Sequence, residues 1–361
     1  MANTSIKLND GATIPWFGFG TGTALFGKDV KDLVVAAIQK GFTHLDGAQQ
    51  YQNEESLGAG IAASGKPRSE LFVTTKLHIL PPGQTVRESL LESLKKLKLD
   101  YVDLFLVHNP ANHQGQLKEI WKQVEEVQKE GLAKSIGVSN FRQHQLEELL
   151  DGATVVPAVN QIEYHPYLFK ISGPLFEFHK KHGIAIASFG GLSSLSRVKG
   201  PVDPVVTGIA ARLSKTAGRP IPEGHVLLLW QRQRGLIFIT TTSNESRLDE
   251  YLSIANTPEL TAEELAAIDE AGSKEHHRVF YGPCYNNTTA RAVSDWMVEE
   301  QEHPGHLKQA NYAIRGLTTF AFPDLDIYLI FLPSFEFPVT YGFGTMVLFD
   351  VIGALRDGSK L

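Results

Sequence analysis

Eight short runs rich in β-branched and aromatic residues recur along this chain, and a segment with apolar residues at helical spacing follows each of them. The runs are WFGFGT (16–21), THLD (43–46), LFVTTK (71–76), YVDLFLVH (101–108), SIGVS (135–139), VVPAVNQIE (155–163), IAIASF (184–189) and LIFITT (236–241). Parallel strands need a crossover of about a dozen residues or more, which is usually a helix. Eight strand–helix units therefore predict an α/β protein whose strands close into a (β/α)8 TIM barrel.

A doubly wound open sheet is the competing architecture. No G-x-G-x-x-G follows the first run and opens a helix, so the usual dinucleotide fingerprint of that fold is missing. The interval from Ile184 to Leu236 is about twice as long as the others and contains the stretch GGLSSLSRVKGPVDP. We expect the loop 190–202 within it to be functional and to lie on the ligand face of the barrel.

The predicted barrel ends at residue 281, and residues 282–361 form an atypical C-terminal extension. The stretch 325–355 is apolar but contains Pro333, Glu336, Pro338 and Asp350, and its longest charge-free piece is 337–349. A transmembrane helix needs about 20 predominantly apolar residues, so the sequence disfavours a membrane span. A lid, a weak membrane anchor and an unselected tail stay open as interpretations of the extension.

Charge and cysteine content narrow the function classes. The net charge of −6, from 34 basic and 40 acidic residues, argues against a nucleic-acid binder. Cys284 is the single cysteine, which excludes an intrachain disulfide and a cysteine-based zinc site. The N-terminus has no signal-peptide pattern. We therefore expect a cytoplasmic protein.

Four polar residues come where catalytic side chains of such a barrel are found, at the carboxyl ends of strands and in the loops that follow them. They are Asp46, Tyr51, Lys76 and His108. A phenol with a pKa near 10 needs help to donate a proton at neutral pH. We expect the Lys76 ammonium to lower the pKa of Tyr51, Asp46 to hold that ammonium, and His108 to orient a carbonyl oxygen.

Each of these residues also has an interpretation that involves no catalysis. A strand-end Asp or His, or a loop Tyr, is most often a cap or a packing residue when taken singly. His44 and Asp46 could belong to a metal-dependent hydrolase, but no second His pair supports that interpretation. His276 and His277 are adjacent rather than three or four residues apart, so we propose no metal site.

Around these residues the chain resembles the aldo-keto reductase family, most of all its fungal and yeast carbonyl reductases. The matching segments, within residues 5–280, are GFGTGT (18–23), HLDGAQQYQNEESLG (44–58), FVTTKL (72–77), DLFLVHNP (103–110), GLAKSIGVSNF (131–141) and VNQIEYHPY (159–167). The resemblance implies an oxidoreductase in which Tyr51 is the general acid, Lys76 and Asp46 tune it, and His108 positions the carbonyl.

The resemblance also implies an NADPH site. Ser139, Asn140 and Gln161 would hold the nicotinamide carboxamide, and Phe189 would stack on the ring where the family usually has Tyr. Thr21, Gly22 and Thr23 are further cofactor-binding candidates. The 2′-phosphate would meet Thr241, Thr242, Asn244 and Arg247. Here the chain lacks the Pro-Lys-Ser sequence that the family often has, which leaves the strictness of NADPH over NADH open.

The sequence thus predicts NADPH-dependent reduction of a ketone or aldehyde to an alcohol. The resemblance favours a small activated carbonyl compound, such as an α-dicarbonyl, and Trp16, Phe26, Asn109 and the loop 190–202 are the candidates for the substrate pocket. We expect no nucleic-acid or membrane partner, and a monomer or weak dimer. Two alternatives stay open: a cofactor-binding regulatory protein with little turnover, and a reductase impaired by its divergent C-terminus.

Overall fold

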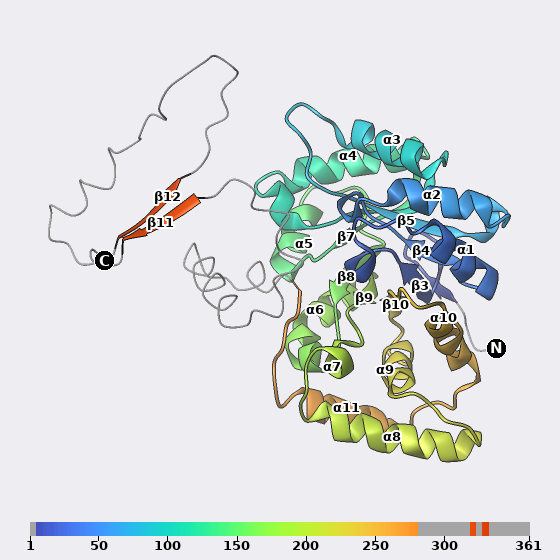
Figure 1. Cartoon of the computed structure of the whole chain (residues 1–361). Helices are drawn as coiled ribbons and strands as arrows, with labels where there is room; N and C mark the ends of the chain where they lie inside the picture. Colours follow the sequence, from blue (N-terminus) through green and yellow to red (C-terminus); the bar gives the residue numbers. More distant parts are fainter. Residues whose placement is uncertain (1–4, 281–317, 323–326, 332–361) are drawn as a thin grey trace, which may run out of the picture. The chain divides into compact units, whose positions relative to one another are not determined.

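The computed structural model of the chain describes residues 5–280, 318–322 and 327–331 (Figure 1). Two compact units are present, Met1–Asn287 and Thr288–Leu361. In the second, β11 (Thr318–Phe322) and β12 (Ile327–Phe331) pair as an antiparallel hairpin. The domain boundary expected after residue 281 falls at the edge of the described part of the first unit and stays a prediction.

The first unit contains a closed barrel of eight parallel strands, which confirms the predicted fold. The strands are β3 (Phe17–Gly20), β4 (His44–Asp46), β5 (Phe72–Leu77), β6 (Val102–Val107), β7 (Ala133–Ser139), β8 (Val159–Glu163), β9 (Ala185–Phe189) and β10 (Ile237–Thr240). They pair in sequence order, and β10 closes the barrel by pairing with β3. The carboxyl ends of all eight strands therefore lie at one end of the barrel, where such folds carry their sites.

Helices surround the barrel, one or more after each strand (Figure 1). They are α1 (Lys31–Lys40), α2 (Glu54–Ala63), α3 (Val86–Leu97), α4 (Leu117–Lys129), α5 (Gln143–Leu150), α6 (Phe169–His182), α7 (Ser193–Ser196), α8 (Val202–Ala217), α9 (Glu223–Arg232), α10 (Glu245–Leu252) and α11 (Ala262–Gly272). Their starts follow local rules: Thr85 and Glu88 form a capping box at α3, and Thr261 and Glu264 form one at α11.

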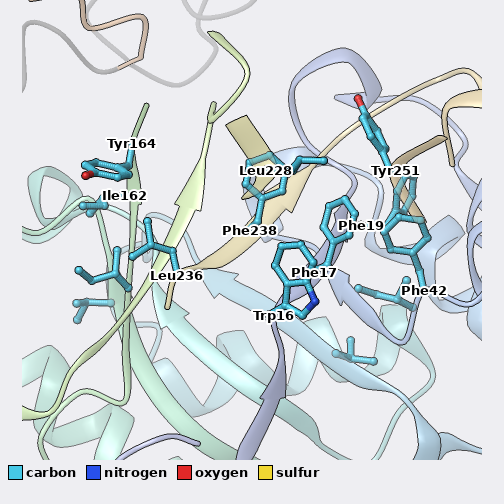
Figure 2. Packing of buried hydrophobic residues seen from close by; sticks show 14 of the residues in the cluster. Trp16, Phe17, Phe19, Phe42, Ile162, Tyr164, Leu228, Leu236, Phe238 and Tyr251 are labelled. Carbon is cyan, nitrogen blue, oxygen red and sulfur yellow. The ribbon is translucent and has the colours of Figure 1, made fainter. Parts of the chain in front are cut away.

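Side chains alternate between the inside and the outside of the barrel along each strand. In β6, Leu104 and Leu106 belong to an inner apolar cluster that also takes residues from β5, β8, β9 and β10. Phe105, between them, belongs to the larger cluster that packs strands against helices. Figure 2 shows part of this outer cluster, including Phe17 and Phe238. The alternation decides which strand-end side chains can reach a shared site.

A short hairpin that the sequence reading missed adds to the inner cluster. It consists of β1 (Ser5–Lys7) and β2 (Thr13–Pro15), and it contributes Leu8 and Ile14 to the cluster. The turn contains Asp10 and Gly11, and Gly11 has φ +91°, a backbone conformation that glycine adopts without strain. An Asp-Gly pair between short strands is a known hairpin signal.

No helix within the described ranges is long and apolar enough to cross a membrane. Most of the apolar stretch 325–355 lies outside the described residues.

Candidate active site

The inside–outside alternation brings three of the four predicted catalytic residues onto the inner face of the barrel. Asp46 is the last residue of β4, Lys76 is near the end of β5, and His108 directly follows β6. Side chains an even number of positions apart on a strand point to the same side. Lys76 therefore points inward like Phe72 and Thr74, and His108 points inward like Leu106. All three side chains are therefore at the carboxyl-terminal mouth.

A buried ion pair forms the base of the site. Nζ of Lys76 lies 2.5 Å from Oδ1 of Asp46, and it also donates to the carbonyl oxygen of Gly47 at 2.8 Å. The two charged side chains are 0% and 1% exposed. An ammonium and a carboxylate are rarely buried this completely unless they are paired. The strand-end lysine thus has the carboxylate that the sequence predicted for it.

Tyr51 completes a chain of polar groups that leads from this pair to the mouth. It ends the 3-10 helix η2 (Gln49–Tyr51), and its hydroxyl lies 3.4 Å from Nζ of Lys76. The Tyr51 ring packs directly against the backbone of Gly22. A methyl group at that position would lie only 2.8 Å from Cζ of Tyr51, so a larger residue would displace the ring. The ring of His108 approaches Tyr51 edge to face, with 5.6 Å between ring centroids.

The loop that carries Tyr51 is fixed by a residue that sequence reasoning overlooked. Asn53 is buried, and its Nδ2 donates to the carbonyl oxygens of Thr21 at 2.8 Å and Leu25 at 2.9 Å. The backbone N–H of Gly27 donates to the carbonyl oxygen of Tyr51 at 2.9 Å. An Asn directly before a helix normally indicates a cap, yet Asn53 makes no side-chain cap bond to α2. Its role could not be read from that position.

The electrostatics of Tyr51 differ from the expectation. We expected Lys76 to lower the pKa of the phenol, but its pKa is raised well above the ordinary value of 10.0, because burial disfavours the phenolate and the charge of Asp46 adds to that effect. The prediction of a lowered pKa is wrong for this structure. The phenol is protonated at neutral pH, which is the form that a proton donor requires.

His108 is neutral. Burial lowers its pKa well below 6.5, and the charge of Lys76 lowers it further. Its Nδ1 is buried and has no hydrogen-bond partner among the described residues. A neutral imidazole carries one N–H donor and one acceptor, so His108 can donate one hydrogen bond to an oxygen at the mouth.

A second polar network joins β6, β7 and β8 beside the ion pair. Oγ of Ser139 donates to the carbonyl oxygen of Gln161 at 2.8 Å, and Nδ2 of Asn140 donates to the carbonyl oxygen of His108 at 2.9 Å. Asn140 has φ +64°. Nε2 of Gln161 donates to Oδ2 of Asp46 at 2.8 Å. The structure thus brings the three residues expected at the nicotinamide carboxamide next to the ion pair of Lys76 and Asp46.

Phe189 ends β9 at the same mouth, on the inward face that Ala187 also occupies. Its ring contacts that of Phe280 edge to face at a centroid distance of 5.5 Å. One face of a ring in this position can pack against a flat ligand.

The other residues expected to bind the cofactor lie in the loops after β3 and β10. The N–H of Thr21 donates to the carbonyl oxygen of Asp46 at 2.9 Å, and Thr23 is exposed with φ +46°. Oγ1 of Thr241 donates to the carbonyl oxygen of Gly20 at 3.0 Å, which ties the two loops together.

The start of α10 offers a mixed environment for a phosphate. Asn244 is its N-cap and accepts from the N–H of Ser246 at 3.0 Å, while Oγ1 of Thr242 accepts from the N–H of Asn244 at 3.0 Å. Arg247 is exposed in the first turn of the helix, but Glu245 adds a negative charge there. A guanidinium and a helix N-terminus attract a phosphate, and the carboxylate opposes it.

Of the three candidate substrate residues, the structure brings two to the mouth. Phe26 is 42% exposed in the loop after β3, next to the Tyr51 loop. Asn109 follows His108, but its Oδ1 is engaged by the N–H of Ala111 at 2.9 Å. The placement predicted for Trp16 is wrong. It precedes β3 at the opposite end of the barrel and is buried against Phe17, with 5.1 Å between ring centroids (Figure 2).

No group of three or more potential metal ligands exists in the described part of the chain. His276 is exposed, and Nε2 of His277 pairs with Glu275 at 2.8 Å. Both histidines thus lie at or near the surface.

Comparison with known proteins gives consistent matches. The sequence profile of the aldo/keto reductase family matches residues 17–273. The NAD/NADP-dependent indole-3-acetaldehyde reductase of Schizosaccharomyces pombe is 38% identical over 74% of this chain and 95% of its own length. The glyoxal reductase of Bacillus subtilis is 35% identical over 75% and 94%. A crystal structure of an aldo/keto reductase from Brucella melitensis superposes with a TM-score of 0.64 at 33% identity, covering 74% of this chain and 98% of that one.

Proposed function

The chain belongs to the aldo/keto reductase family, and from that premise we propose that it reduces a ketone or aldehyde to an alcohol with NADPH as hydride donor and Tyr51 as proton donor. The observation that carries the proposal is the buried chain from Asp46 through Lys76 to the Tyr51 hydroxyl, with neutral His108 beside it. A structural ion pair alone would not need a phenol and an imidazole at its open end.

Each of the four residues has a distinct task in this proposal. Tyr51 gives its proton to the carbonyl oxygen as the carbon is reduced, and Lys76 offsets the charge that the phenolate then carries. Asp46 keeps the ammonium charged and in place. His108, being neutral, donates a hydrogen bond to the same oxygen and fixes its direction. When bound, the nicotinamide supplies the hydride for the carbonyl carbon.

The polar network of β7 and β8 fits a carboxamide. Such a group has two N–H donors and one carbonyl acceptor, and it needs oxygens that are not already engaged. Within the described residues, Oδ1 of Asn140 and Oε1 of Gln161 accept no hydrogen bond, because the side-chain bonds of both residues use their nitrogens. We propose that these two oxygens accept the carboxamide N–H groups, and that Phe189 packs on the ring.

For the 2′-phosphate we propose Arg247, assisted by the loop residues Thr241 and Thr242 and by the N-terminus that Asn244 caps. The guanidinium is exposed and always charged, as a phosphate ligand should be. Glu245 works against a strong preference for the phosphate. The relative from Schizosaccharomyces pombe is named as NAD/NADP-dependent, which fits a site of moderate selectivity.

As substrate we propose a small activated carbonyl compound such as an α-dicarbonyl. Relatives named glyoxal reductase and methylglyoxal reductase support this class. Phe26 offers an exposed ring at the edge of the mouth, and Asn109 lies next to His108. The cytoplasmic location and the monomeric or weakly dimeric state stay predictions.

Replacing the phenol tests the proposal. Tyr51→Phe should lower turnover of NADPH with a panel of carbonyl compounds by roughly 100- to 10,000-fold, the range of general acid catalysis. Cofactor affinity, measured by quenching of protein fluorescence, should stay nearly unchanged. Tyr101→Phe is the matched control, because Tyr101 precedes β6 at the other end of the barrel. Unchanged turnover in Tyr51→Phe would refute the assignment.

The same panel addresses the regulatory alternative. A wild-type protein that binds NADPH but reduces none of the carbonyls would favour a cofactor-binding regulator over a reductase.

A further inference from the structure

A carboxylate that the proposed reaction does not use lies at the mouth of the barrel. Glu163 is the last residue of β8, and it is buried. Because side chains alternate along a strand, Glu163 shares the inward face of β8 with Gln161 and lies one level closer to the mouth. Its partner in the strand register is Phe189 of β9. A buried carboxylate at this level requires a specific set of donors.

Those donors come from a segment far away in the sequence. The backbone N–H of Val279 donates to Oε1 of Glu163 at 2.7 Å, and the N–H of Phe280 donates to Oε2 at 3.0 Å. Nη1 of Arg278 lies 3.5 Å from Oε2, and Nε2 of His165 lies 3.2 Å from Oε1. Each carboxylate oxygen of Glu163 therefore accepts a hydrogen bond from one backbone N–H of the segment that follows α11.

This attachment brings an aromatic ring to the site. Phe280 contacts Phe189 edge to face, and a methyl group at Gly190 would lie 3.0 Å from Cε2 of Phe280. The guanidinium of Arg197, in the loop after β9, lies 5.1 Å from the centroid of the Phe280 ring. Phe280 thus packs between the end of β9 and the loop 190–202, which was expected to be functional.

We propose that Glu163 is a positioning residue that anchors the segment 278–280, and that it thereby makes Phe280 one wall of the substrate pocket. The second half of this inference rests on the proposed reductase function. An anchored ring beside Phe189 favours carbonyl compounds with an apolar or aromatic body and matters little for the smallest aldehydes. Glu163 acts on the substrate only through Phe280.

The anchor is tested by amide hydrogen exchange on the full chain with Glu163→Gln. The glutamine keeps one acceptor oxygen and turns an NH2 group toward an N–H donor. We expect the amides of Val279 and Phe280 to exchange at least about tenfold faster, since hydrogen bonds to charged groups are among the stronger ones. The amides of β8 should keep their protection, which shows that the barrel is intact.

The effect on substrates is read from steady-state kinetics. Glu163→Gln should raise KM for a phenyl-bearing ketone about 2- to 10-fold, which is the effect expected from losing one aromatic contact. The kcat for a small aldehyde should stay unchanged. Glu275→Gln is the matched control, because Glu275 lies on the same segment and bonds the side chain of His277. Phe280→Ala should reproduce the change in KM, and it tests the wall independently if Glu163→Gln fails to fold.

Unchanged exchange at Val279 and Phe280 in Glu163→Gln would overturn the anchor. Faster exchange with an unchanged KM, or an unchanged KM in Phe280→Ala, would overturn the role of Phe280. If the wild type reduces no carbonyl, the reductase proposal and the substrate wall fail together. The exchange rates still decide whether Glu163 is the anchor.

Discussion

Asp46→Asn tests whether the buried ion pair has the energetics that its geometry implies. The substitution keeps the shape of the side chain and removes its charge. The ammonium of Lys76, which is fully buried, then loses the carboxylate that faces it at 2.5 Å. Gly47 still offers its carbonyl oxygen at 2.8 Å, so hydrogen bonding is only partly lost. The substitution therefore removes the charge and also turns one acceptor oxygen into an NH2 group, which must face the donor of either Lys76 or Gln161.

The expected loss of stability follows from two opposing contributions. At 2.5 Å and an effective dielectric constant of about 20, the attraction between the charges is about 7 kcal/mol. Most of this only offsets the desolvation of two ions, so the intact pair contributes little in net terms. Removing one partner is different, because the other stays buried. We expect Asp46→Asn to lower the free energy of unfolding by about 3–5 kcal/mol.

Urea denaturation at pH 7 measures this loss, and a second substitution tests its cause. If the loss comes from a buried charge without its carboxylate, then Lys76→Met in the Asp46→Asn background should restore part of it. The double variant should be more stable than the single one, although we expect turnover in neither. A loss under about 1 kcal/mol, or a double variant no more stable than Asp46→Asn, would refute the reasoning.

Two further predictions concern the cofactor and acid stability. Arg247→Ala should weaken NADPH binding roughly tenfold or more and NADH binding much less, because only the 2′-phosphate needs the charge; isothermal titration measures both, and equal losses would place the phosphate elsewhere. Burial lowers the pKa of His44 from 6.5 to about 4. Between these two pH values the His44 imidazole is therefore protonated in the unfolded chain but stays neutral in the folded protein. Stability should therefore fall as the pH drops from 6.5 to about 4, by about 2 kcal/mol between pH 7 and 5 from His44 alone. Urea midpoints over that range should change less steeply in His44→Gln, and an equal slope would contradict this account.

The barrel could be predicted because each strand and each helix has its own recognisable sequence pattern. Each strand is a short run of β-branched or aromatic residues, and each helix has a periodic apolar face, such as Leu117, Ile120, Trp121, Val124 and Val127 of α4. The strand-end positions of Asp46, Lys76 and His108 follow from the same reading. The β1–β2 hairpin also carries a local signal, its Asp-Gly turn.

Other features depend on information that local patterns do not contain. Trp16 is an exception, because it begins the predicted strand 16–21, and the rule that places strand-end side chains at the mouth already places a strand start at the opposite end of the barrel. The pKa of Tyr51 depends on how deeply its phenol is buried, and the sequence shows only that Lys76 is near. Asn53 looks like a helix cap and instead holds the loop of Tyr51.

The contact between Gln161 and Asp46 shows where such prediction stops. In the closed order of strands, β4 and β8 lie four apart, on opposite sides of the barrel. The inside of an eight-stranded barrel is narrow enough for side chains to fill, so an inward amide can reach an inward carboxylate across it. Alternation predicts that both residues point inward, but their level along the axis depends on the shear of the strands. That level makes Gln161 a partner of Asp46 and leaves Glu163, two positions later, free to hold the backbone of Val279 and Phe280.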